Sequence, residues 1–279
     1  MQIAVISPAD RLHYCNYGDM HMSLAHLVLK NEEYAAYYAQ VAIMNFVILD
    51  NSAFELEQQG IGIPFDMVFD AARRTNPDEV IATDTLFKGP ETIESTWEFI
   101  KNIPKDLEGK FRIMAVPQGR DRDEWYNCLE KLLEIPKVDT IGLSKLSVPA
   151  CWEGGHRKSG AVSRSRVECA KTLNHRLWLK ALQGKEIHLL GSDDWGGWEL
   201  EQQERLRHEG VPIRSCDSSV TVWYGAHGER FSSVSGKMDQ FIAKKPDLEC
   251  EMKGTCKQID AHETDILHNI ATLHKFSKA

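Results

Sequence analysis

Short apolar runs rich in β-branched residues alternate along the chain with longer segments of helical hydrophobic period. Runs of this length and composition, bounded by polar or turn residues, are typical of buried strands. They occupy residues 3–7, 45–50, 79–84, 112–119, 140–145, 186–191 and 212–217. A further strand, the eighth, is expected within the run SSVTVWYG at residues 218–225.

Helical spacing or helix-start signals mark the segments between these runs. They cover residues 64–74, 90–103, 121–135, 165–175 and 198–210. Pro64 stands near the start of the first, Asp121 or Asp123 is expected to cap the third, and Gly210 to end the last. Strands that alternate with helices in this way predict a parallel sheet with helical crossovers, and seven or eight such units favour a (β/α)8 TIM-like barrel.

The length of the chain fits one barrel domain spanning residues 1–279. The pattern loosens towards the end, so residues 221–279 are expected to form a short, partly helical C-terminal extension packed on the barrel. No apolar run approaches the ~18 residues that cross a bilayer. The seven cysteines are scattered, which fits reduced thiols, so we expect a cytoplasmic protein, in the host cytoplasm if a phage encodes it.

Three aspartates and a glutamine stand at the ends of four predicted strands. They are Asp50, Asp84, Gln118 and Asp217. The carboxyl ends of parallel barrel strands converge on one mouth, where active sites lie, so these side chains are expected to share a cavity. Each aspartate taken alone is more simply a helix cap. Together they suit glycosyl transfer, in which one carboxylate attacks the anomeric carbon and a second manages the proton.

The same carboxylates also suit a metal-dependent barrel hydrolase, since carboxylate oxygens bind divalent cations. Such barrels generally add histidines at strand ends, and here only His188 lies close. A hydrogen-bonded core histidine explains His188 without a metal. Glycosyl chemistry is therefore the favoured interpretation.

The charge balance opposes a nucleic-acid substrate, because the net charge is −8 and phosphate binding usually leaves a basic footprint. One segment, residues 156–166, runs against this average, since it carries Arg157, Lys158, Arg164 and Arg166 and no acid. We expect these four residues to bind phosphates as a clamp or mobile lid. An exposed, solvated loop is the alternative.

Six short motifs occur in the order and spacing of a known family. They are LDNSAFE (49–55), EVIATD (79–84), VPQG (116–119), IGLSK (141–145), HLLG (188–191) and CDSS (216–219). Over roughly residues 1–220 the chain resembles the tRNA-guanine transglycosylase superfamily. It is most similar to the phage and bacterial DNA-modifying branch, the DpdA-type DNA-guanine transglycosylases.

The resemblance implies a role for each strand-end residue. Asp217 is the nucleophile that forms a covalent sugar ester, and Asp50 is the carboxylate that handles the proton of the departing base. The substrate-binding residues it implies are Asp84 and Gln118 at the guanine edge, Gly142 and Leu143 through their backbone, and Ser52 beside Asp50. The partners it implies are DNA and a free 7-deazaguanine base, with a helper protein left open.

Some residues depart from the family pattern. Ser52-Ala53 replace paired glycines, and IGLSK replaces a glycine-rich stretch. No cofactor is required for the chemistry. The zinc motif of the RNA enzymes is incomplete, because only Cys250 and Cys256 precede a histidine set, namely His262, His268 and His274. We favour the interpretation that Cys250 and Cys256 are surface cysteines remaining from a lost zinc motif over a structural zinc site, and we assign no metal ligand.

Two other functions remain as alternatives. One is a tRNA-directed transglycosylase, and the other is a catalytically inactive barrel that acts as a nucleic-acid-binding subunit. The presence of both Asp50 and Asp217 argues against inactivity, since binding alone needs no nucleophile. DNA is preferred to tRNA because the motif variants and the short C-terminal region resemble the DNA branch.

Overall fold

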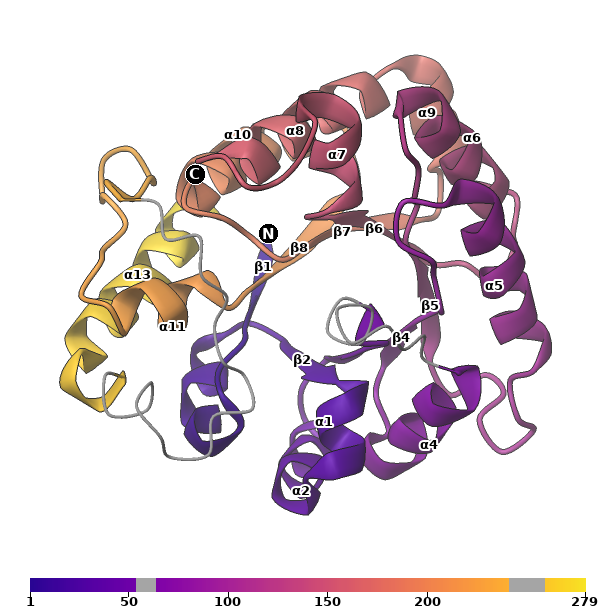
Figure 1. Cartoon of the computed structure of the whole chain (residues 1–279), viewed down its shortest axis with the longest axis horizontal. Helices are drawn as coiled ribbons and strands as arrows, with labels where there is room; N and C mark the ends of the chain where they lie inside the picture. Colours follow the sequence, from indigo (N-terminus) through magenta and orange to yellow (C-terminus); the bar gives the residue numbers. More distant parts are fainter. Residues whose placement is uncertain (54–63, 241–258) are drawn as a thin grey trace.

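The chain forms a parallel eight-stranded barrel surrounded by helices (Figure 1). The computed structural model describes residues 1–53, 64–240 and 259–279. The strands are β1 Gln2–Val5, β2 His21–Leu24, β3 Val47–Asp50, β4 Glu79–Ile81, β5 Arg112–Ala115, β6 Thr140–Ser144, β7 Glu186–Leu190 and β8 Ile213–Ser218. They pair in the order β1-β8-β7-β6-β5-β4-β3-β2, and a single parallel bridge between Ala4 and Met20 joins β1 to the segment before β2. The predicted (β/α)8 TIM-like barrel is confirmed.

Helices follow the strands in the alternation that the sequence predicts. They are η1 Ala9–Tyr17, α1 Ala25–Lys30, α2 Glu32–Val41, α4 Phe65–Thr75, α5 Gly89–Lys101, α6 Arg122–Leu133, α7 Ser147–Glu153, α8 Ala161–Leu173, α9 Arg176–Ala181, α10 Gly196–His208, α11 Val220–Gly225 and α13 Glu263–Phe276. Pro64 precedes α4, and the Asp121 carboxylate caps α6 by accepting a hydrogen bond from the backbone N–H of Glu124. Gly210 follows α10 and has a φ of 112°, a conformation that suits glycine and is incompatible with continuation of the helix.

The eighth strand lies elsewhere than predicted. Residues 218–225 do not form a separate strand, because Ser218 ends β8 and Val220–Gly225 is helix α11. The missing strand is β2, which pairs in parallel with β3 over residues 21–24. Its HMSL sequence is short and interrupted by polar residues, so its hydrophobic pattern is weak.

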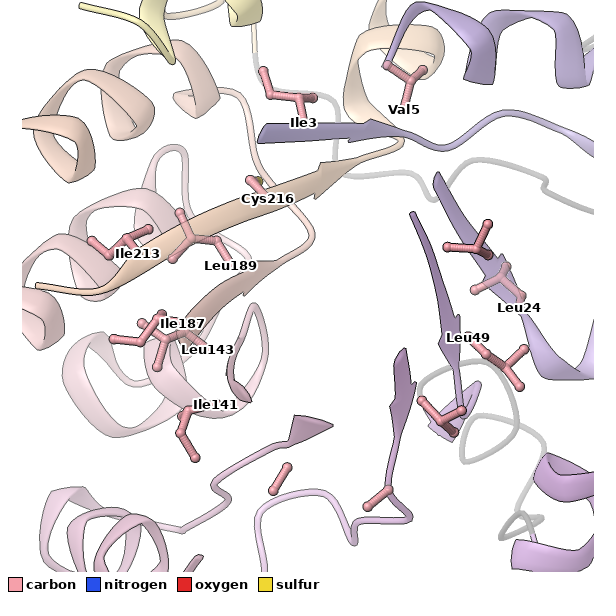
Figure 2. Close-up of a cluster of buried hydrophobic side chains, with 14 of the residues drawn as sticks. Ile3, Val5, Leu24, Leu49, Ile141, Leu143, Ile187, Leu189, Ile213 and Cys216 are labelled. Carbon is pink, nitrogen blue, oxygen red and sulfur yellow. The ribbon is translucent and has the colours of Figure 1, made fainter. Parts of the chain in front are cut away.

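Strand alternation divides the core into two layers. Outward-facing side chains such as Leu143, Ile187 and Leu189 form the layer between the sheet and the helices (Figure 2). The interior of the barrel is filled by a smaller cluster that includes Met22 and Met114. The barrel is therefore a packed core rather than a pore, and a ligand must bind at one of its ends.

A charged layer closes the end of the barrel where the strands begin. Glu79 on β4 is fully buried and accepts a hydrogen bond from the Thr140 hydroxyl at 2.5 Å. Arg214 on β8 pairs with Glu79 and, at 3.0 Å, with Glu186, while Arg112 pairs with Glu186 at 2.6 Å. The two arginines and two glutamates compensate one another, as buried charges require. The opposite end is left for the site.

The C-terminal helix α13 packs against α10, α11 and β1. Asn269 on α13 fixes this contact, because its amide oxygen accepts from the Phe231 N–H and its amide nitrogen donates to the Thr221 and Glu229 carbonyls. None of the described helices is long and apolar enough to cross a membrane.

Candidate active site

A pocket opens at the carboxyl ends of the strands and collects the predicted strand-end residues. It is lined by Ile6, Leu24, Asp50, Asn51, Ala53, Ile81, Asp84, Leu86, Val116, Gln118, Ser144, Lys145, Leu146, Leu190, Gly191, Asp217 and Ser219. Its volume of about 110 Å³ is several times the ~30 Å³ that a water molecule occupies in the liquid, so it suits a small ligand. Both apolar and charged side chains line it, as in many small-molecule sites.

Asp217 is held in one orientation on β8. Its Oδ1 accepts a hydrogen bond from the Gly191 N–H at 2.7 Å and lies 3.2 Å from Nε2 of His188. Among the residues that the structure describes, no donor bonds to Oδ2. The residue is 5% exposed and lines the pocket. One oxygen is thus anchored, and the other is available to a ligand.

Asp84 is fixed from both sides by carboxamides. The Asn51 amide nitrogen donates to its Oδ1 at 2.9 Å, and the Gln118 amide nitrogen donates to its Oδ2 at 2.6 Å. The Gln118 oxygen in turn accepts from the Phe87 N–H at 3.1 Å. A carboxylate oxygen has two lone pairs, so each oxygen of Asp84 can accept a second hydrogen bond beside the one that Asn51 or Gln118 donates. Gln118 has at most one amide hydrogen left for the same purpose.

Asp50 ends β3 and lines the pocket, with its Oδ1 accepting from the Ser52 N–H at 2.8 Å. Ser52 itself adopts a left-handed conformation with a φ of 59°. Its side chain is fully buried, its Oγ accepts from the His26 N–H at 3.3 Å, and it does not line the pocket. Ser52 therefore shapes the turn that presents Asp50, and its prediction as a substrate-binding residue is wrong for this pocket.

Gly142 and Leu143 are also not among the residues that line the pocket. Gly142 points into the barrel below it, where a Cβ would come within 2.7 Å of the Leu190 Cδ1. Leu143 points outward and is fully buried against the helices (Figure 2). The lining residues of this strand come next in the chain and are Ser144 and Lys145. The predicted backbone contact from Gly142 and Leu143 is therefore displaced along the strand.

Asn51 and Lys145 are among the lining residues that had no role in the sequence prediction. Lys145 lies beside Gly191, whose φ of 69° and lack of a side chain leave room for the lysine stem. Burial lowers the pKa of His156, and the positive charges of Lys145 and Arg157 lower it further. Lys145 thus brings a cation into a pocket that also holds three carboxylates. The position of both residues at strand ends was the available signal.

Arg166, predicted to contact phosphate, is fully buried. It lies on α8 and forms two hydrogen bonds of 2.7 Å to Glu199, whose side chain is also buried. Its remaining nitrogen donates to the Leu190 carbonyl at 2.9 Å and the Leu143 carbonyl at 3.3 Å. The prediction for Arg166 is wrong, because its guanidinium ties a helix to the ends of β6 and β7 behind the pocket.

Carboxylates bind the rest of the basic segment at several points. Asp194 accepts from the Ser159 hydroxyl and the Gly160 N–H, and the neighbouring Asp193 caps the start of α8 by accepting from two of its backbone N–H groups. Arg164 pairs with Glu153 at 2.7 Å and lies over the Trp195 ring.

Arg157 and Lys158 are exposed and remain the candidates for phosphate contact. Cys250 and Cys256, the thiols of the incomplete zinc motif, lie outside the described residues. His262 bonds to Asp265, His268 to the Phe231 carbonyl and His274 to the Tyr17 carbonyl. Within residues 1–53, 64–240 and 259–279, no group of three or more metal-binding side chains comes together.

The fold and the pocket define a (β/α)8 barrel whose strand ends present three carboxylates, a glutamine and a lysine to one small cavity. A scan against models of known protein families and a search of curated proteins found no match to this chain. Its chemistry must therefore be argued from the pocket itself.

Proposed function

We propose that the protein is a base-exchanging transglycosylase that replaces guanine in DNA with a 7-deazaguanine through a covalent ester between Asp217 and the sugar. The observation that carries the proposal is the orientation of Asp217. Its Oδ1 is held by Gly191 and His188, while the carboxylate lines the same pocket as Asp50 and Asp84. A binding module has no need of a carboxylate fixed in this way, whereas a nucleophile does.

In the first displacement, Oδ2 of Asp217 attacks C1′ of the sugar. The C1′–N9 bond breaks, and its electron pair stays on the guanine, which takes up a proton from the Asp50 carboxyl group. The transition state has oxocarbenium character, so nearby negative charge stabilises it. The products of this step are free guanine, the Asp217 ester and an ionised Asp50.

In the second displacement, the incoming 7-deazaguanine gives its ring N–H proton to Asp50, and its nitrogen attacks C1′. The ester bond breaks, and its electron pair returns to Asp217 as a carboxylate. Both side chains regain their starting states, and two inversions at C1′ retain the configuration. Exchange rather than hydrolysis requires water to be kept from the ester, which the enclosed position of Asp217, only 5% exposed, favours.

Asp84 is the residue that suits recognition of guanine. A guanine edge presents the N1–H and N2–H₂ donors, and a carboxylate accepts two such donors side by side. Asn51 and Gln118 hold Asp84 so that it cannot rotate away. Adenine carries no such donor pair and could not supply the two hydrogen bonds that guanine gives to Asp84, so it is discriminated against.

The experiment that tests the proposal is a base-exchange assay on two nucleic acids. The protein is incubated separately with duplex DNA and with tRNA, each with candidate 7-deazaguanine bases, and the digested nucleosides are analysed by mass spectrometry. A 7-deazaguanine deoxynucleoside in the DNA reaction is the expected product. Modification of tRNA alone would assign the tRNA-directed alternative.

The Asp217→Asn variant is the control for chemistry, because it removes the nucleophile with little change of shape. A wild-type protein that binds DNA but exchanges no base, with or without a cell extract to supply a helper protein, would refute the proposal. That outcome would favour the inactive nucleic-acid-binding barrel. Exchange that persists in Asp217→Asn would contradict the assignment of the nucleophile.

A further inference from the structure

His188 is unusual for a core histidine, because both of its ring nitrogens belong to a line of hydrogen-bonded polar groups. It lies on β7 inside the barrel and is fully buried. Its Nε2 lies 3.2 Å from Oδ1 of Asp217, and its Nδ1 lies 2.7 Å from the Ser215 hydroxyl. The Ser215 oxygen in turn accepts a hydrogen bond from Nε of Arg214 at 3.0 Å. The line therefore runs from the charged layer, at the end of the barrel where the strands begin, to Asp217, the candidate nucleophile.

The direction of the donors along this line fixes the tautomer of His188. Arg214 can only donate, so the Ser215 oxygen is an acceptor on that side. The single hydroxyl hydrogen of Ser215 then has the His188 Nδ1 as its acceptor, and among the described residues no other acceptor bonds to it. With Nδ1 accepting, the proton of the neutral ring lies on Nε2 and points at Asp217.

We propose that His188 is a positioning residue for Asp217, with Ser215 holding its ring in the Nε2–H tautomer. The catalytic role of Asp217 rests on the proposed transglycosylase function. The arrangement of donors around Asp217 is a property of the fold and is testable without any substrate.

The chemistry explains why two donors on Oδ1 are useful throughout the reaction. When Oδ2 attacks the sugar, Oδ1 becomes the carbonyl oxygen of the ester and still accepts from His188 and from Gly191. When the ester breaks, negative charge returns to the carboxylate, and the same two donors stabilise it. Loss of the His188 donor should therefore slow the second displacement, in which Asp217 leaves as a carboxylate, and loosen the alignment of Oδ2 for the first, while binding of the free base stays nearly unchanged.

The first test reads the tautomer of His188 directly by ¹⁵N NMR of the wild-type protein labelled in its histidine rings, with the His188→Gln spectrum to assign the signal. The expected result is a ring that carries a proton on Nε2 and none on Nδ1. In Ser215→Ala, which removes the hydroxyl donor, a mixture of tautomers is expected. A proton on Nδ1 in the wild type would overturn the proposal, whatever the activity.

The second test compares variants in steady-state base exchange. His188→Leu, which removes the donor, should lower kcat about 100-fold and change the KM of the free base less than about threefold, as loss of one oriented donor does in other enzymes. His188→Gln places an amide N–H near the Nε2 position and should recover most of the lost rate. His21→Gln is the matched control, because His21 is also buried in a strand but faces Tyr37 and Tyr38 outside the barrel.

The outcomes distinguish the positioning role of His188 from the proposed transglycosylase function. Equal losses of kcat in His188→Gln and His188→Leu, each with a matching fall in melting temperature, would show that His188 only fills space and would overturn the proposal. An Nε2–H ring together with no exchange by the wild type would refute the transglycosylase function and leave the donor arrangement supported.

Discussion

Replacing Arg166 by methionine is expected to destabilise the protein strongly. Methionine nearly matches the length of the arginine stem but leaves Glu199 without its guanidinium partner. The Glu199 side chain is 1% exposed, so water cannot take the place of Arg166. The described contact that remains to it is the Ser163 hydroxyl at 3.2 Å. The carbonyls of Leu143 and Leu190 lose a donor as well.

The size of the effect follows from this burial. Removing one partner of a buried ion pair costs about 3–5 kcal/mol, because the other charge stays uncompensated. For a domain of this size, a loss of 1 kcal/mol lowers the melting temperature by about 2–4 °C, so a fall of roughly 6–20 °C is expected. Replacing Arg166 and Glu199 together by methionine removes both charges and should recover at least half of that loss.

The cost should also depend on pH. Burial raises the pKa of Glu199 above its ordinary value, while Arg166 acts in the opposite direction, so loss of Arg166 raises the pKa further. A carboxyl group whose pKa is higher in the folded state than in the unfolded state binds more protons when folded. The free energy of unfolding therefore falls as the pH rises above the pKa that the group has in the unfolded state. Arg166→Met should therefore be less destabilising at pH 5 than at pH 8.

Thermal and urea unfolding at both pH values measure these effects. A fall in melting temperature of less than about 3 °C, or a double variant as unstable as the single one, would contradict the reasoning, since either result would mean that the pair is not buried and coupled as described. A changed salt dependence of DNA binding in stably folded Arg166→Met would restore the phosphate-contact interpretation.

Three further outcomes concern the site. Asp217→Asn should lower base exchange about 10⁴-fold or more with little loss of stability, since an amide still accepts at Oδ1 but is a poor nucleophile; residual exchange within tenfold of wild type, by nucleoside analysis, would contradict this. Asp84→Ala should weaken binding of a soluble 7-deazaguanine by ~2–4 kcal/mol in calorimetry, and equal affinities would argue against it as the guanine reader. Changing Arg157 and Lys158 together to serine should flatten the slope of log affinity for duplex DNA against log salt by about 1–2 units, and an unaltered slope would mean that neither contacts phosphate.

The barrel was predictable because its strands are short, apolar and separated by helices with clear start signals. The one misplaced strand shows the limit of hydrophobic pattern. The run at 218–225 has the β-branched and aromatic composition of a strand, yet Val220–Gly225 becomes a helix packed on α13. Tertiary packing overrides local propensity there, because the sheet already has its eight strands.

The shared pocket of Asp50, Asp84, Gln118 and Asp217 was predictable from one rule, the convergence of strand ends. Other site predictions failed because they needed side-chain direction. Strand alternation sends Leu143 outward and Gly142 inward below the pocket. The basic segment reads as a loop from its glycine and serines, yet residues 161–166 begin helix α8, and its inner face carries Arg166 into the core.

The weakest closure of the barrel lies between β1 and the segment before β2. β1 and the segment before β2 meet through the single Ala4–Met20 bridge, whereas each neighbouring pair of strands from β3 round to β8 is joined by a ladder of at least two residue pairs, with one register shift between β7 and β8. Amide hydrogens along this seam should exchange with solvent before those elsewhere in the sheet. Asp50, Asp84, Gln118, Lys145 and Asp217 all follow or end strands of the continuous part. Asp217 on β8 and Asp50 on β3 lie on opposite sides of this seam, so opening of the seam should change the distance between these two carboxylates while Asp84, Gln118 and Lys145 stay joined by the continuous part of the sheet.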